Sequence, residues 1–291
     1  MKERSLIAFT LLAQMAVGSF WVAGALNLWA AAKDGAAAAD ALTGSALLIA
    51  PLFMFLGLLA LFFHLGAPLN AWRALSNWRS SWLSREVLFA MLFTGAGGMV
   101  AVLEWRESSA SPDAVHDAIM WAAALLGLAL IFSMSRAYQL RTVPAWDTHL
   151  TPLAFFTTTL LLGGLAAGVT LALDPDAPAE LLRSALRWIA VGAIVLWGVQ
   201  LALVRLWIAR LTGEPGAAAR AATQLAQEHG SILRLRLALA VPGMLVAAIV
   251  LLPWETGVMD KIAIIAAFML ALVSDVLGRV LFYEARVRYG V

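Results

Sequence analysis

Long runs of apolar residues, separated by short polar stretches, follow one another along the whole chain. A helix needs about 20 apolar residues to cross the hydrocarbon core, and its backbone groups must hydrogen-bond within the segment. None of the runs shows the alternating pattern of a transmembrane β-strand. We therefore expect an all-α integral membrane protein, an eight-helix bundle, with helices at about 5–32, 43–64, 86–104, 116–137, 151–173, 182–209, 232–252 and 258–283.

The connections between these runs are polar and mostly short. The longest, 211–231, contains an alanine-rich part at 217–227 that predicts a short surface helix. No stretch resembles a separate soluble domain, so residues 1–291 are interpreted as one membrane domain. The fourth and the last membrane helix both end in an arginine followed by an aromatic residue, which suggests two four-helix halves.

Composition supports a location in the bilayer. Of 291 residues, 62% are hydrophobic and 13% are charged, whereas soluble domains are nearer half apolar and a quarter charged. The run from Leu6 to Ala32 exceeds the roughly 7–15 apolar residues of a signal-peptide core, so we interpret it as a membrane helix. Cysteine is absent, which excludes disulfides, thiolate-bound Fe–S clusters and thiolate zinc sites from this protein.

Most of the 20 Lys and Arg residues fall on one side of the membrane if all eight segments cross it. This side holds both termini and the connections after the second, fourth and sixth helices. The positive-inside rule therefore predicts a multi-pass membrane protein with both termini in the cytoplasm. Arginines that dock a partner or line a site would bias this count.

Residues 62–86 hold the densest group of ionisable and aromatic side chains. Apolar residues, three of them tryptophans, recur there every three or four positions, which predicts an interfacial helix over 68–82 with tryptophans at headgroup depth. An anchoring belt is the simpler interpretation of these tryptophans. The repeat consists of Leu69, Trp72, Leu75, Trp78 and Trp82.

His64 and Glu86 flank this stretch at the ends of successive membrane helices. Oxidation of a quinol releases two protons and two electrons. A histidine can accept a proton near neutral pH, and a partly desolvated glutamate can pass it on. The alternative is an interfacial histidine and a glutamate in the first turn of a helix capped by Ser84, where the helix dipole favours a carboxylate.

Haem and other metals are not expected, because His64 alone among the four histidines ends a membrane run. Arg136, Tyr138 and Arg279 are further candidates for a quinone site. Asp275 and Arg279 lie four residues apart and share a helix face, so either an intrahelical salt bridge or a role in lining a site fits them. Arg136 could equally extend to the membrane interface.

Four stretches, spread from the first membrane helix to the last, share a pattern with known proteins: FTLLAQMAVGSF at 9–20, FHLGAPLNAWRALSNWRSSWLSREV at 63–87, RAYQLRTVPAWDTHLTPLAFF at 136–156 and LGRVLFY at 277–283. They resemble the anchor subunits of the dimethyl sulfoxide reductase family, and this implies a multi-pass protein of the bacterial cytoplasmic (inner) membrane. The resemblance implies an eight-helix, haem-free anchor that holds a four-cluster Fe–S ferredoxin-like subunit and a molybdopterin catalytic subunit. It also implies that menaquinol or ubiquinol is oxidised at His64 and Glu86.

We therefore predict the membrane anchor and quinone-reactive subunit of a respiratory molybdopterin oxidoreductase, which passes electrons in either direction between membrane quinone and a partner Fe–S subunit. A secondary transporter or channel is the alternative; it would need polar groups near the midplane and broken helices. A purely structural anchor is another, and nucleic acid is not an expected partner. The predicted catalytic residues are His64 and Glu86, and the predicted quinone-binding residues are His64, Glu86, Arg73, Arg85, Arg136, Tyr138 and Arg279.

Overall fold

The computed structural model describes residues 2–62, 75–105, 113–253 and 257–287. Its described part contains 8 helices that are long and apolar enough to cross a membrane, so the predicted number of spans is confirmed. They are α1 (Lys2–Asp34), α2 (Ala36–Phe62), α3 (Trp82–Trp105), α4 (Asp113–Tyr138), α5 (Leu150–Leu173), α6 (Ala179–Gly213), α8 (Gly230–Ile249) and α9 (Val258–Glu284). The predicted surface helix is α7 (Ala217–Gln227).

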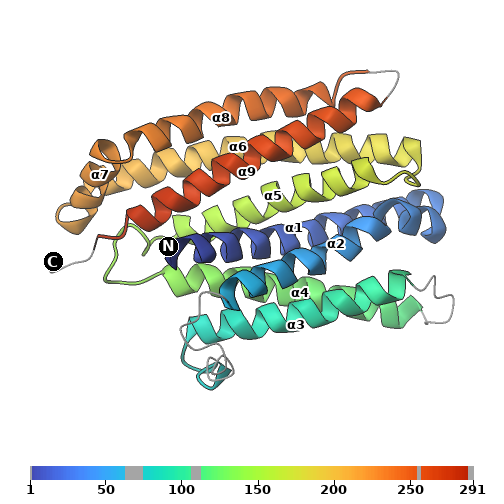
Figure 1. Ribbon diagram of the computed structural model, residues 1–291, viewed down its shortest axis with the longest axis horizontal. Helices are drawn as coiled ribbons and strands as arrows, with labels where there is room; N and C mark the ends of the chain where they lie inside the picture. The colour runs from blue at the N-terminus through green and yellow to red at the C-terminus, as the bar shows by residue number, and fades with distance from the viewer. Residues whose placement is uncertain (1, 63–74, 106–112, 254–256, 288–291) are drawn as a thin grey trace.

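The eight long helices lie side by side along the longest axis of the molecule (Figure 1). The start of α1, the end of α9 and the short helix α7 all lie at one end of this bundle, which we call the α7 end. The connection between α4 and α5 lies there too (Figure 1). Segments that the sequence places on one side of the membrane therefore gather at one end of the bundle.

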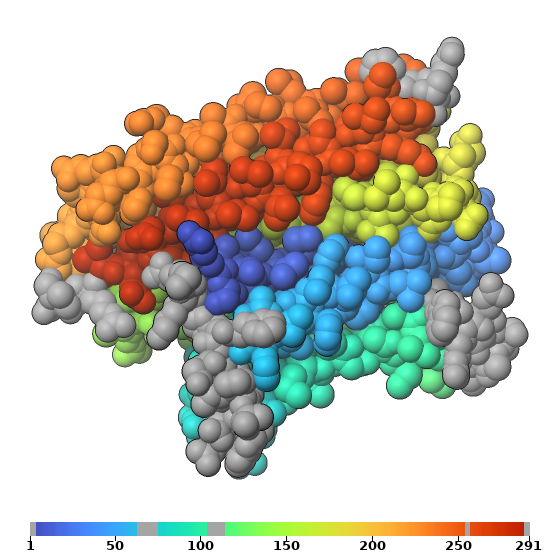
Figure 2. All heavy atoms as spheres, viewed as in Figure 1, coloured from blue at the N-terminus to red at the C-terminus, as the bar shows by residue number. Residues whose placement is uncertain are grey.

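The long helices form two groups of four. In the first group α1 packs on α2, α2 on α3, α3 on α4 and α4 on α1. In the second, α5, α6, α8 and α9 close a ring in the same way. On the face shown in Figure 2, α8 and α9 cover one half and α2 and α3 the other, with α1 and α5 visible only between them. This arrangement matches the two four-helix halves suggested by the sequence.

The two groups join mainly where α1 crosses α5. Gly18 and Gly163 meet backbone to backbone, and a Cβ atom at either position would overlap the other helix. Small residues allow this close approach, on which helix association in lipid depends. As a result α1 and α5 are the most buried spans, 67% and 72% over their most apolar windows, and every other span is at most 39% buried.

The prediction of an interfacial helix over 68–82 is wrong for the described residues of this stretch. Residues 75–81 form turns, and Trp82 already belongs to α3. The Asn77 carbonyl accepts hydrogen bonds from the Ser81 N–H at 2.9 Å and from the Ser80 hydroxyl at 3.3 Å. The bond from the Ser80 side chain competes with the backbone for this carbonyl, and such local side-chain bonds of serine disfavour a continuing helix.

The cap of α3 also differs from the expectation. The Ser81 hydroxyl accepts the N–H of Ser84 at 3.3 Å, so Ser81 rather than Ser84 caps this helix. Glu86 consequently lies beyond the first turn of α3. The helix dipole acts mainly within the first turn, so it does not explain a carboxylate at this position.

Candidate functional site

Buried and half-buried polar side chains from seven helices gather inside the bundle, in the half nearer the α7 end. Among them Glu86, Asp275 and Arg279 are each no more than 6% exposed. Charged groups at membrane depth are costly and mark candidate functional sites. The set consists of Gln14, Glu86, Tyr138, Thr158, Gln200, Arg236, Asp275, Arg279 and Tyr283.

Glu86 faces the second four-helix group from its place in α3. The Arg279 guanidinium and the hydroxyls of Tyr138 and Tyr283 all lie within electrostatic range of its carboxylate. Residues from three elements far apart in the sequence, α3, α4 and α9, thus lie within electrostatic range of one another. Glu86 is the candidate proton acceptor, and Arg279 is its positive neighbour.

The two tyrosines form a direct pair at the ends of α4 and α9, with their hydroxyl oxygens 2.5 Å apart. Rings of Trp146, Phe155 and Phe282 surround Tyr138 at centroid distances of 5.4–5.7 Å. The indole N–H of Trp146 also donates to the Phe282 carbonyl at 2.6 Å. The pair is therefore held in an aromatic enclosure that restricts where the hydroxyls can point.

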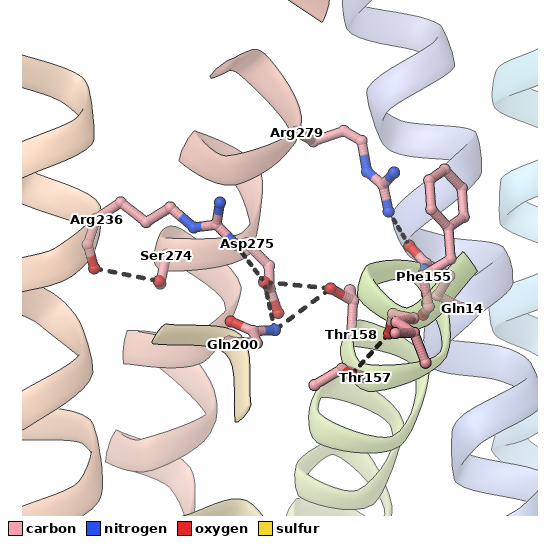
Figure 3. Close-up of polar contacts among 10 residues, drawn as sticks. Gln14, Phe155, Thr157, Thr158, Gln200, Arg236, Ser274, Asp275 and Arg279 are labelled. Atoms are coloured by element: carbon pink, nitrogen blue, oxygen red, sulfur yellow. Dashed lines mark hydrogen bonds and ion pairs between the residues drawn. The ribbon is translucent and has the colours of Figure 1, made fainter. Parts of the chain in front are cut away.

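Arg279 points towards Gln14 and Phe155 (Figure 3). Its guanidinium donates to the Gln14 side-chain oxygen at 2.5 Å and lies over the Phe155 ring, 4.0 Å from the centroid. Gln14 in turn donates to the Phe155 carbonyl at 2.7 Å. A cation held by a hydrogen bond and an aromatic face is well placed to orient a carbonyl or hydroxyl oxygen.

Asp275 occupies a second polar cluster, deeper in the bundle (Figure 3). Its Oδ1 accepts hydrogen bonds from Gln200 at 2.9 Å and Thr158 at 3.4 Å, and lies 4.0 Å from the Arg236 guanidinium. Its Oδ2 is buried and has no hydrogen-bond partner among the described residues. Asp275 lies nine residues before the end of α9, about 14 Å at 1.5 Å per residue.

The intrahelical Asp275–Arg279 pair, one of the two sequence alternatives, is not formed within the described part of the protein. Asp275 pairs with Arg236 of α8, while Arg279 donates to Gln14 of α1. Both residues line one cavity, which is compatible with the second alternative, a role in lining a site. Each side chain meets a partner on a neighbouring helix that sequence spacing cannot reveal.

Arg236 follows a connecting segment in the sequence, but it belongs to α8 and its side chain is only 16% exposed. It fits over Gly278 of α9, where a Cβ atom would lie 2.5 Å from the guanidinium carbon. Arg279 is likewise buried. Neither arginine therefore contributes to the positive-inside signal at a membrane surface.

A cavity of about 80 Å³ lies among α5, α6, α8 and α9. One part of its wall is polar and includes Thr158, Gln200, Arg236, Asp275 and Arg279. The rest is apolar and aromatic, with Phe155, Trp207 and Phe282 among its members.

The residues predicted for a quinone site divide into three sets. Glu86, Tyr138 and Arg279 converge, as described above. Arg85 and Arg136 instead lie over the Trp82 ring, with their guanidinium carbons 4.3 and 5.4 Å from the ring centroid. Arg136 is exposed. His64 and Arg73 lie outside the described residues.

Two site residues escaped sequence reasoning although a signal was present. Gln14 and Gln200 are amides inside long apolar runs, and buried polar groups in a membrane need partners. Arg236 was hidden by its position close to the start of α8. In the described residues no group of three or more His, Asp or Glu side chains could hold a metal ion.

Comparison with known proteins identifies the family. The model of the DMSO reductase anchor subunit (DmsC) matches residues 1–285. The protein is 31% identical over 301 residues to the anaerobic dimethyl sulfoxide reductase chain YnfH of Escherichia coli (strain K12). The aligned region covers 99% of the present sequence and 96% of the relative. It is 25% identical over 292 residues to an anaerobic dimethyl sulfoxide reductase chain of Haemophilus influenzae, with the same coverage.

A further relative is a sulfite dehydrogenase subunit of Allochromatium vinosum, 36% identical over 157 residues that make up 50% of the present sequence and 46% of that protein. Membership of such complexes implies catalytic and electron-transfer partner subunits. With its eight membrane helices, the protein belongs to the family of DMSO reductase anchor subunits, the multi-pass membrane anchors of respiratory molybdopterin oxidoreductases.

Proposed function

We propose that this subunit oxidises membrane quinol and passes the electrons to an Fe–S partner subunit. The observation that supports it most is the burial of the Glu86 carboxylate beside Arg279 and the Tyr138–Tyr283 pair. Oxidation of one quinol yields one quinone, two protons and two electrons. The protons need an acceptor within the membrane, and a desolvated carboxylate supplies one.

Each predicted residue receives a role in this proposal. Glu86 and His64 accept the protons, His64 on the strength of the sequence alone. Arg279 and Tyr138 orient the quinol oxygen from the opposite side, since both lie in range of Glu86. Arg85 and Arg136, which flank Trp82, guide the head group at the rim, together with Arg73.

The electrons leave towards a four-cluster Fe–S subunit, which we place with the molybdopterin subunit at the α7 end, nearest to Glu86. We propose that this end faces the cytoplasm. The substrate is menaquinol or ubiquinol. Relatives are named both as reductase and as dehydrogenase components, so the same site is proposed to work in reverse, with quinone taking up the electrons and protons.

Two substitutions in the purified complex test this proposal. Glu86→Gln keeps the size of the side chain and removes the proton acceptor. We expect quinol-linked turnover to fall about 100-fold, while turnover driven by a reduced dye that donates directly to the partner subunits stays unchanged. We expect the same two results for His64→Ala: a loss of quinol-linked turnover and unchanged dye-driven turnover. The matched control is Glu180→Gln, an exposed acid at the start of α6.

Normal quinol-linked turnover in both site variants would contradict the proposal. The rival interpretation, a purely structural anchor, predicts that the wild-type complex binds no quinone-analogue inhibitor. We expect inhibitor binding to the wild type and weaker binding to Glu86→Gln, measured by fluorescence quenching of the inhibitor.

A further inference from the structure

The oxygen Oδ2 of Asp275 is an acceptor inside the membrane part of the protein that no described residue pairs. The residue is 3% exposed and lines the cavity of about 80 Å³. A water molecule occupies roughly 30 Å³ in the liquid and needs two to four polar partners. Oδ2 and the nearby side chains of Arg236, Gln200 and Thr158 offer such partners, so the cavity has room for water that would hydrate the carboxylate.

Arg279 connects this hydrated acid with Glu86. Its guanidinium interacts electrostatically with both carboxylates, and the contacts with Gln14 and Phe155 keep it from moving towards either. The two acids therefore share one fixed cation. A charge change at one acid changes the electrostatic potential at the other directly through space, so this coupling needs no movement of Arg279 or of the backbone.

The charges of the network balance. Glu86 and Asp275 oppose Arg236 and Arg279, and Gly278 leaves the space in which Arg236 reaches Asp275. The other described side chains that contact the two acids, the two arginines or the tyrosines are neutral when the tyrosines are protonated. They are Thr10 and Gln14 from α1, Tyr138 from α4, Thr158 from α5, Gln200 from α6, and Ser274 and Tyr283 from α9.

Protonation of Glu86 would disturb this balance by one charge. Arg279 would then have Asp275 as its remaining acidic neighbour. We propose that Asp275 is a positioning residue for quinol oxidation: its hydrated carboxylate balances Arg279 while Glu86 holds a proton taken from the quinol. The inference rests on the proposed function. It means that Asp275, in the second four-helix group, supports electrostatically a proton transfer to Glu86, in the first group.

Asp275→Asn in the purified complex tests the proposal. The substitution removes one negative charge, makes the potential at Glu86 more positive and so disfavours its protonation. Because turnover needs Glu86 as a free acceptor, the acid limb of the pH profile of quinol-linked turnover should move about one pH unit lower. Asp275→Glu, which keeps the charge, should restore the wild-type profile. Dye-driven turnover should not change.

Asp260→Asn is the matched control. Asp260 lies on the same helix, is 2% exposed and pairs with Arg183 at 3.7 Å. It is 15 residues from Asp275, about 22 Å along α9, so its removal should leave the acid limb in place.

Arg236→Gln gives a test of opposite sign that does not depend on the folding of Asp275→Asn. Loss of this cation makes the network more negative and should move the acid limb to higher pH. Profiles of Asp275→Asn and Arg236→Gln that superimpose on those of the wild type and Asp260→Asn would overturn the inference. If Asp275→Asn does not assemble, a pH profile of Arg236→Gln that equals the wild-type profile is by itself enough to overturn the inference.

An infrared titration separates this inference from the proposed function. In the complex free of quinol, the carboxyl band assigned to Glu86 by its loss in Glu86→Gln reports protonation directly. Movement of its midpoint to lower pH in Asp275→Asn supports the coupling between the two acids even if quinol-linked turnover does not need Glu86. An unmoved band contradicts the coupling even if Glu86 is essential.

Discussion

The hydroxyl oxygens of Tyr138 and Tyr283 lie 2.5 Å apart and join the last turn of α4 to the last turn of α9. These helices belong to different four-helix groups. At the α7 end the groups are thus connected by a hydrogen bond next to Glu86, whereas near the middle of α1 and α5 they meet through glycines.

Replacing either tyrosine by phenylalanine removes the same hydrogen bond. We expect Tyr138→Phe and Tyr283→Phe each to lower the unfolding free energy by about 1 kcal/mol, and the double variant to cost little more than one of them. Thermal unfolding of the detergent-solubilised complex measures this. Additive losses would show that the hydroxyls act independently.

Arg279→Lys keeps the positive charge and removes the planar guanidinium. A lysine cannot both stack on Phe155 and reproduce the bond to Gln14. We expect quinol-linked turnover to fall about tenfold, which corresponds to the loss of one charge-assisted hydrogen bond of roughly 1.5 kcal/mol. Arg205→Lys, at an exposed position of α6, is the control. Wild-type turnover in Arg279→Lys would mean that charge alone suffices.

Gly163→Ala should disrupt the junction of the two groups. The added methyl would overlap the backbone of Gly18, which cannot move aside as a side chain does. We expect the free energy of unfolding to fall by about 3 kcal/mol, at the upper end of the usual cost of overpacking. The adjacent Gly164→Ala is the matched control, because its methyl meets only the Val22 side chain at an ordinary 3.5 Å. Equal thermal stability of the two variants would refute this account.

Arg85→Gln and Arg136→Gln test the proposed role of these two arginines in guiding the quinol head group to the site. Both guanidiniums contact the Trp82 ring and lie away from the buried cluster, so their removal should weaken quinol capture without changing the chemistry. Cation–π contacts at exposed sites contribute about 0.5–1 kcal/mol, so we expect KM for quinol to rise about two- to fivefold with kcat unchanged. A fall in kcat would place these arginines at the reacting atoms.

The sequence by itself determined the number, order and approximate bounds of the membrane helices and the position of α7. These features are local, because a run of apolar residues must span the hydrocarbon core whatever its neighbours are. It also singled out Glu86, Tyr138 and Arg279, since ionisable and hydroxyl groups stand out in apolar runs.

Only the tertiary structure decided which of these residues meet. Asp275 and Arg279 share a helix face, yet each takes its partner from another helix, because the packing of α8 and α1 against α9 brings Arg236 and Gln14 within reach. The turn at 75–81 has a local cause instead: Arg85 of α3 donates to the carbonyls of Trp78 and Arg79, seven and six residues earlier, and the helical pattern of 68–82 does not predict these bonds. Pairings between distant segments depend on how the helices pack, and helical periodicity describes one segment at a time.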